Sequence, residues 1–231
     1  LISIDNNYQS CLVAPTEILV FQHFKNFKET FEKLGLVVKV LTGSTKSSER
    51  KILLNDLKNG SINLLIGTHA IFEQSVIFKN LGYAVIDEQH RFGVKQRSKI
   101  WEKSNPPPHV LIMTATPIPR TLTMSLYGDL DLSIIDELPP GRKDVITVQR
   151  KDKNRLKVFG FIRDQINQGR QIYIVYPLIE ESKKMDLKYL HDGFESIVRE
   201  FDKENYSIGV MHGRMRSSNK DIEMNRFLNG Y

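Results

Sequence analysis

The chain has 231 residues, of which 40% are hydrophobic, so it is long and apolar enough for one large or two small globular domains. Its single cysteine, Cys11, excludes a disulfide framework or a cysteine-based metal site within the chain, and we expect a reducing, cytoplasmic setting. No apolar run approaches the roughly 20 residues of a membrane-spanning helix, and no signal-peptide pattern opens the sequence. The formal net charge of +6 favours an anionic partner such as nucleic acid.

The first part of the chain alternates short apolar runs with helical periodicity, which predicts an α/β fold with a mostly parallel sheet. The expected strands span residues 10–14, 37–41, 63–67, 83–86 and 109–113. The expected helices span residues 16–34, 47–59 and 91–103. In the first helix, apolar residues recur every three or four positions and predict a core face: Ile18, Phe21, Phe24, Phe27, Phe31 and Leu34.

Proline and glycine at 139–141 indicate a linker, so we place a domain boundary between residues 141 and 142. Beyond it, alternation predicts a strand over 145–149, and a second strand is expected over 171–176, after a helix that Gly169 ends. Helices are expected from about 156 to 168 and from about 187 to 204. The sequence therefore predicts a first domain over 1–141 and a second over 142–231.

An internal repeat at a constant offset of 170 relates the two parts of the chain. The residues of the first copy are Gly43, Ser47, Ser48, Ile52, Asn55, Asn59 and Gly60. Those of the second are Gly213, Ser217, Ser218, Ile222, Asn225, Asn229 and Gly230. Each copy reads as a strand end, a serine-capped helix and an Asn-Gly stop, so we expect segments 40–60 and 210–230 to share one fold.

The apolar run over 83–86 ends abruptly in two acids, Asp87 and Glu88. Ligands of parallel sheets bind at the carboxyl ends of the strands, where these acids are expected to lie. Neighbouring residues on a strand point to opposite sides, so one acid is expected to hold Mg²⁺ and the other to orient or deprotonate an attacking water. The alternative is that the two acids only cap the strand.

The segment Asp87-Glu88-Gln89-His90-Arg91-Phe92-Gly93, followed by Met113-Thr114-Ala115-Thr116-Pro117 and the residues to Leu122, resembles motifs II and III of superfamily 2 helicases. Within that superfamily the combination is similar to the RecG family of bacterial ATP-dependent DNA helicases. The resemblance implies two tandem RecA-like domains, both incomplete in this chain. It also implies ATP and Mg²⁺ as cofactors and branched or forked DNA as the partner, in recombination and repair. We expect a monomer.

The family's motifs assign roles to residues of this sequence. Asp87 would hold Mg²⁺, Glu88 would be the catalytic base, and Gln89 and His90 would link the nucleotide to motif III. Thr114, Ala115 and Thr116 would couple nucleotide state to the DNA or the domain interface. The expected DNA-backbone contacts are Pro15, Thr16, Gly43, Ser44, Thr68, His69, His212, Gly213 and Arg214. For His69, a purely structural hydrogen bond is the alternative.

The helicase motor also needs a glycine-rich loop ending in Lys-Ser/Thr to cradle phosphates, and this sequence has none, so we expect it to precede Leu1. Two other readings stay open. The same motor drives double-stranded DNA translocases of the transcription-repair coupling type, which usually carry Glu-Gln where this chain has Gln89-His90. A non-catalytic remnant of the fold is the second.

Overall fold

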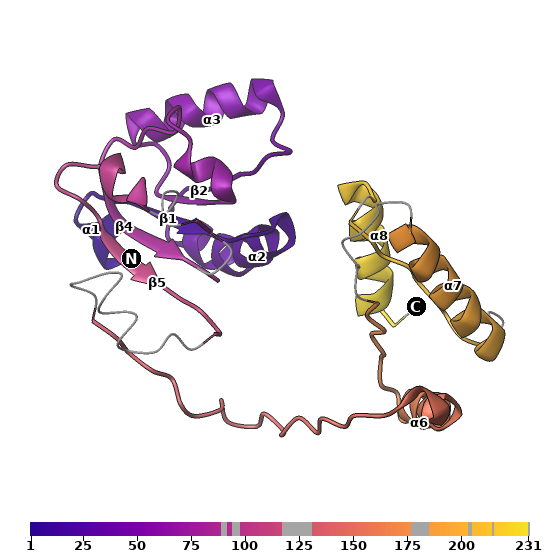
Figure 1. The fold of residues 1–231 in the computed structure, drawn as a ribbon. Helices are drawn as coiled ribbons and strands as arrows, with labels where there is room; N and C mark the ends of the chain where they lie inside the picture. Colours follow the sequence, from indigo (N-terminus) through magenta and orange to yellow (C-terminus); the bar gives the residue numbers. More distant parts are fainter. Residues whose placement is uncertain are drawn as a thin grey trace. The chain divides into compact units, whose positions relative to one another are not determined.

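A computed structural model of the chain describes residues 1–88, 92–93, 98–116, 131–176, 185–202, 205–213 and 215–230. The chain divides into two compact units, unit 1 (Leu1–Asp136) and unit 2 (Glu137–Tyr231) (Figure 1). This division falls a few residues before the boundary expected from the prolines and the glycine at 139–141. The assignment of 1–141 and 142–231 to two helicase domains stays a prediction.

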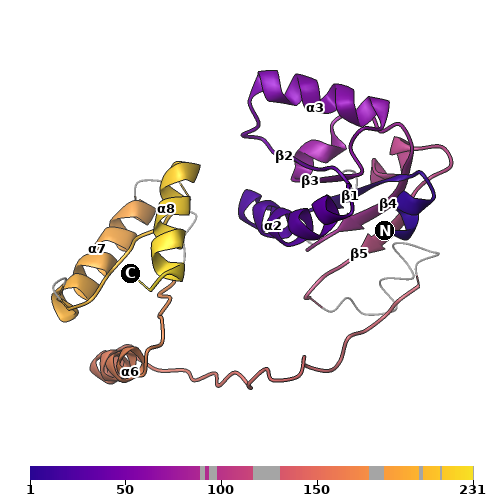
Figure 2. The same cartoon turned by 180° about the vertical axis from the view of Figure 1, so that it is seen from behind.

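Unit 1 contains a five-stranded parallel sheet with strand order β2-β3-β1-β4-β5. The strands are β1 (Gln9–Val13), β2 (Val38–Leu41), β3 (Leu64–Gly67), β4 (Leu81–Ile86) and β5 (His109–Ile112). All five strands predicted from the sequence are therefore present, within one or two residues at each end. Seen from both sides, α2 (Glu17–Lys33) and α3 (Ser47–Asn59) flank the sheet (Figures 1 and 2).

The two faces of the sheet bury separate clusters, as the twofold alternation of side chains along a strand requires. Along β1, Cys11 and Val13 join the cluster that contains Leu57 of α3. Leu12 belongs to the opposite cluster, which contains Val20 of α2. The short helix α1 (Ile2–Asp5) contributes to this second cluster, and the 3₁₀ helix η1 (His69–Phe72) contributes to the first. Unit 1 is a three-layer α/β arrangement.

The predicted core face of α2 is only partly right. Phe24, Phe27 and Phe31 pack on the sheet as predicted. The side chains of Ile18, Phe21 and Leu34, however, are 50%, 48% and 56% exposed. Helical residues advance by about 100°, so repeated steps of three drift around the helix by about 60° each. The buried face instead follows Val20 with steps of four and three, which keeps one direction toward the sheet.

The helix α3 begins at Ser47, and its N-cap residue Lys46 makes no side-chain capping bond, so the predicted serine cap is wrong. Its end is as predicted, because Gly60 adopts the left-handed conformation with φ 84°. Gly67, at the end of β3, meets a different demand. A Cβ atom there would lie 2.2 Å from the backbone oxygen of Leu41, so this close approach of two strands requires glycine.

The basic segment expected as a helix over 91–103 is described only in part. Within it, Trp101–Lys103 forms the 3₁₀ helix η3. The Lys103 ammonium donates to the carbonyl oxygens of Glu73 and Val76, the second at 2.8 Å. Burial lowers the pKa of this lysine. The segment is thereby fixed to the chain that follows η1.

The regular secondary structure in the described part of unit 2 is helical: the 3₁₀ helix η4 (Asp152–Asn154), α6 (Arg155–Asn167), α7 (Met185–Glu200) and α8 (Ser217–Leu228). Phe159, Ile197 and Phe201 form its core. The strands expected at 145–149 and 171–176 are not formed there, and Val145 and Val175 are 81% and 85% exposed. Alternation in sequence favours an extended backbone, but a strand also needs a hydrogen-bonded neighbour, and these segments have none among the described residues.

The internal repeat is seen in the two helices. α3 begins at Ser47 and α8 at Ser217, which reproduces the offset of 170. Both helices are followed by a glycine with positive φ, 84° at Gly60 and 80° at Gly230. Among the described residues, a strand precedes only the first copy, as β2, so the structure supports the duplication for the helix and its stop.

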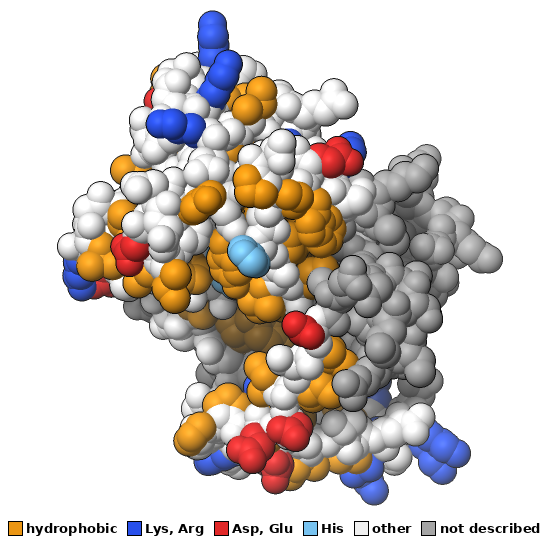
Figure 3. Space-filling model, turned by 90° about the vertical axis from the view of Figure 1, so that its left-hand side faces the viewer, with side chains coloured by type: hydrophobic (Ala, Val, Ile, Leu, Met, Phe, Trp, Pro, Cys, Tyr) orange, Lys and Arg blue, Asp and Glu red, His pale blue; other side chains and the backbone are white. Residues whose placement is uncertain are grey.

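Large apolar side chains also lie at the surface, among them Ile2 at 82% and Leu111 at 44% exposure. Hydrophobic side chains also gather on the face shown in Figure 3. Within the described residues, no helix is both long and apolar enough to cross a membrane.

Candidate functional site

Backbone hydrogen bonds just past the strand ends align five loops at one edge of the sheet of unit 1. The Asp87 amide donates to Val13 at 2.9 Å, and the Met113 amide donates to Ile86 at 2.8 Å. On the other side of β1, the Thr68 amide donates to Leu41 at 3.1 Å. Because the strands are parallel, the loops after β1 to β5 all emerge at the carboxyl edge, where the sequence places its site residues.

Asp87 lies directly after β4 and contacts a side chain of α2. Its Oδ2 lies 3.0 Å from Nε2 of His23, and the two side chains are 20% and 25% exposed. An ionised carboxylate has no proton, so the imidazole N–H donates. The sequence did not point to His23, which lies between the apolar residues Phe21 and Phe24 of the expected core stripe.

Glu88 follows Asp87 in the left-handed region, with φ 49°. Residues other than glycine adopt this region at a cost, and such residues cluster at functional sites. Because β4 ends at Ile86, the expected alternation of the two acids along a strand does not apply. The left-handed turn, rather than the pleat, sets the direction of Glu88.

The loop after β5 carries the hydroxyl residues expected to couple motif II to the rest of the motor. The hydroxyl oxygens of Thr114 and Thr116 lie 2.9 Å apart, and the Thr116 amide donates to the Thr114 hydroxyl at 3.2 Å. Thr114 is half-buried, whereas Ala115 and Thr116 are exposed. This turn is therefore held by its own side chains and presents its tip to solvent.

Two of the loops predicted to contact DNA meet through α2. Thr16 caps α2, and its hydroxyl accepts from the Leu19 amide at 3.4 Å. The amide of Ser44, one of the predicted phosphate donors, donates to the Glu17 carboxylate at 3.1 Å. The Ser44 amide is thus bonded to a carboxylate of α2. No sequence pattern pointed to Glu17, which lies in the first turn of α2.

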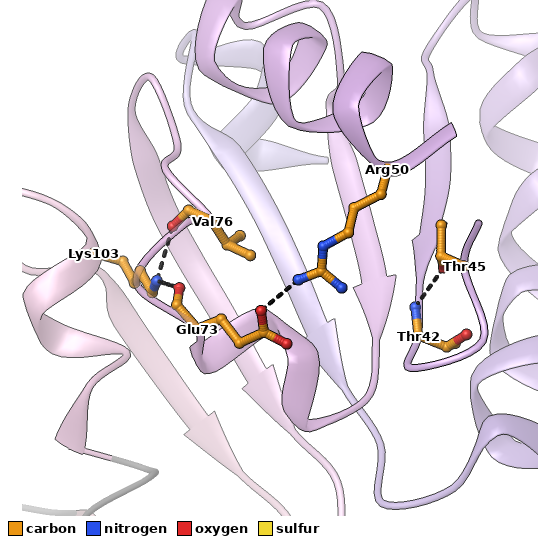
Figure 4. Close-up of polar contacts among 6 residues, drawn as sticks. All are labelled: Thr42, Thr45, Arg50, Glu73, Val76 and Lys103. Carbon is orange, nitrogen blue, oxygen red and sulfur yellow. Dashed lines mark hydrogen bonds and ion pairs between the residues drawn. The ribbon is translucent and has the colours of Figure 1, made fainter. Parts of the chain in front are cut away.

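The loop after β3 is fixed from two sides (Figure 4). Arg50 of α3 pairs with the carboxylate of Glu73, at the end of η1, and Lys103 holds the Glu73 carbonyl. Thr68 is 3% exposed, and its hydroxyl oxygen has no hydrogen-bond partner among the described residues. His69, the next residue, is exposed. The predicted contact residues of this loop, Thr68 and His69, thus precede a turn that Arg50 and Lys103 hold in place.

Gly43 lies in the same loop as Ser44, and further predicted DNA contacts belong to unit 2. In unit 1, Gly43 is exposed, and the neighbouring Thr42 is tied by a bond from its amide to the Thr45 hydroxyl at 2.9 Å (Figure 4). In unit 2, His212 is half-buried, and the Gly213 carbonyl accepts from Lys220 at 3.0 Å. Three predicted site residues lie outside the described residues: Gln89, His90 and Arg214.

The family model for the DEAD/DEAH box helicase matches residues 1–125, more than half of the chain. The chain belongs to this helicase family. The match covers β1 to β5 and the loops at their carboxyl edge, including β4 and the two acids that follow it.

Two relatives of the chain are named ATP-dependent DNA helicase RecG. The chain is 46% identical to the ATP-dependent DNA helicase RecG of Synechocystis sp. over 98% of its length, and 45% identical to that of Aquifex aeolicus over 97%. It spans 27% and 28% of those proteins. A solved structure, RecG bound to a three-way DNA junction, matches with a TM-score of 0.67 at 38% identity, over 96% of this chain and 28% of that one.

The carboxylate of Asp87 suits the Mg²⁺ of a helicase. Mg²⁺ prefers hard oxygen ligands and is usually held by one or two carboxylates together with substrate phosphates and water. The bond from His23 uses one acceptor position of Asp87, and a carboxylate has about four. Within the described part of the chain, no three His, Cys, Asp or Glu residues cluster as an all-protein metal site.

Proposed function

We propose that the chain is the central part of an ATP-dependent DNA helicase of the RecG type, which remodels branched DNA and stalled forks in recombination and repair. The observation that carries the proposal is the position of Asp87 and Glu88 at the carboxyl edge of a parallel sheet, beside four further motif-bearing loops. The identity of 46% to a RecG over nearly the whole chain supports it. Residues 1–141 and 142–231 would be its two RecA-like domains.

In this function the cofactors are ATP and Mg²⁺. Asp87 would hold the Mg²⁺, and a bound Mg²⁺ would supply positive charge near the transferred phosphoryl group. Glu88 orients the attacking water and accepts its proton. Gln89 and His90 link the nucleotide to the loop of Thr114, Ala115 and Thr116. The half-buried position of Asp87 and the left-handed turn at Glu88 support two distinct roles.

The DNA partner lies against the other loops of the same edge and against the repeat in unit 2. Backbone amides and hydroxyls of short loops bind phosphate without reading sequence, and this suits a motor that moves along DNA. The proposed contacts are Pro15, Thr16, Gly43, Ser44, Thr68, His69, His212, Gly213 and Arg214. We place the protein in the cytoplasm, where bacterial DNA lies.

The test is strand separation by the full-length protein on a labelled forked DNA and on a linear duplex. We expect ATP-dependent unwinding of the fork, none with a non-hydrolysable ATP analogue, and none from Glu88→Gln. A protein that displaces a third strand from duplex DNA with ATP, yet leaves forks intact, would be the translocase of the transcription-repair coupling type. Absence of both activities in the wild-type protein would indicate a non-catalytic remnant.

A further inference from the structure

The contact between His23 and Asp87 joins the centre of a helix to the acid proposed to hold Mg²⁺. The Nε2–Oδ2 distance is 3.0 Å, a normal hydrogen bond, and both side chains are three-quarters buried or more. The bond spans 64 residues of sequence. The tertiary fold, and not proximity in sequence, therefore brings the two side chains together.

The helix that carries His23 is fixed at three places. Val20 is fully buried and Phe31 is 8% exposed in the core beneath α2. Thr16 caps its first turn. Glu17 accepts the Ser44 amide from the loop after β2. A helix held in this way gives the imidazole a defined position, and a bond from it selects one orientation of the Asp87 carboxylate.

The remaining support for Asp87 comes from its backbone, because its amide donates to Val13. That bond fixes the Cα atom and leaves rotation about χ1 and χ2 open. Partners that hydrogen-bond a metal-binding carboxylate fix its orientation, and their loss commonly weakens metal affinity by 10- to 100-fold. His23 is the described side chain that supplies such a bond to Asp87.

We propose that His23 is a positioning residue for Mg²⁺: by donating its Nε2–H to one carboxylate oxygen of Asp87, it orients the other oxygen toward the metal. The inference rests on the proposed function of Asp87. It adds a residue of α2 to the residues after β4 that are proposed to bind Mg²⁺. Since α2 also begins at the loop proposed to contact DNA, the same helix supports the DNA loop and the metal acid.

The experiment compares His23→Ala, His23→Gln and the control Glu29→Ala in the full-length protein. The amide nitrogen of a glutamine reaches about as far as Nε2 of histidine, so His23→Gln keeps a donor. Glu29 lies on the same helix and pairs with Lys33 at 2.7 Å on the exposed surface. The readouts are equilibrium binding of a fluorescent ATP analogue across a Mg²⁺ titration and kcat at low and saturating Mg²⁺.

For His23→Ala we expect the Mg²⁺ concentration at half-maximal nucleotide binding to rise on the order of tenfold. Its kcat should return toward the wild-type value at saturating Mg²⁺, which a misfolded variant would not show. His23→Gln should stay within about twofold of wild type, as should Glu29→Ala, because the donor is kept or the site is untouched. An unchanged Mg²⁺ titration in His23→Ala, or an equal defect in His23→Gln, would overturn the inference. A wild-type protein without Mg²⁺-dependent ATP binding would instead refute the proposed function.

Discussion

Replacing Gln9 with methionine tests the buried polar network that joins the first strand of unit 1 to two of its connections. Gln9 is 5% exposed. Its side-chain amide nitrogen donates to the carbonyls of Leu57 at 3.0 Å and Ile62 at 2.8 Å. Its oxygen accepts from the amides of Lys79 at 2.7 Å and Asn80 at 3.2 Å. Methionine has a similar length and volume but forms none of these four bonds well.

The magnitude follows from the groups that lose their partner. The Leu57 carbonyl keeps the Gly60 amide at 3.1 Å, so three groups are left: the Ile62 carbonyl and the amides of Lys79 and Asn80. A buried polar group without a partner costs about 1–3 kcal/mol. Lys79 is exposed and Asn80 half-buried, so water relieves part of this cost. We therefore take about 1 kcal/mol for each of the three groups and expect a loss of about 3 kcal/mol in the free energy of unfolding.

The assay is urea denaturation followed by the fluorescence of Trp101, the single tryptophan of the chain, which packs against the core of unit 1. An exposed glutamine of the same unit, Gln22, supplies the matched control Gln22→Met, which should change stability by less than about 0.5 kcal/mol. A Gln9→Met variant as stable as this control would refute the network as a source of stability.

Two other properties of the chain are open to direct measurement. Burial raises the pKa of the Cys11 thiol from 9.0 to about 12, so the reactive thiolate is scarce at pH 8. Alkylation of Cys11 by iodoacetamide should therefore be far slower in the native protein than in urea. Equal rates would contradict the buried position of this thiol. The isolated 231-residue chain, which has no phosphate loop, should bind DNA weakly, with affinity that falls steeply as salt rises, and should not hydrolyse ATP at a motor's rate. DNA-dependent ATP turnover by this chain would contradict that account.

The sheet of unit 1 was predictable because its strands are short apolar runs that end in turn residues. Asp87 and the loop residues Thr68 and Thr116 follow such runs, and parallel strands bring their carboxyl ends to one edge. Two segments of unit 2, 145–149 and 171–176, also have the composition of strands, yet no strand forms there among the described residues. A local sequence pattern favours an extended backbone, but a strand also needs a hydrogen-bonded partner, which residues elsewhere in the chain must supply.

The side-chain contacts of the site were less predictable. His23 and Asp87 are 64 residues apart, so no spacing rule links them. The position of His23 on α2 depends on which face of the helix is buried, and steps of three in the apolar stripe concealed that Val20 defines this face. Likewise, the turn at Glu88 depends on a φ angle of 49°, which glutamate does not signal in a sequence.

The most direct test of the central claim measures ATP hydrolysis and ATP binding by the full-length protein and its Glu88→Gln variant, with forked DNA present. Glutamine keeps the shape of Glu88 and removes the base. We predict that the variant binds Mg·ATP about as tightly as wild type, while DNA-stimulated turnover falls by about 10²-fold or more. Unchanged turnover in Glu88→Gln would contradict the assignment of the acid-ended strand as the catalytic centre of a helicase motor.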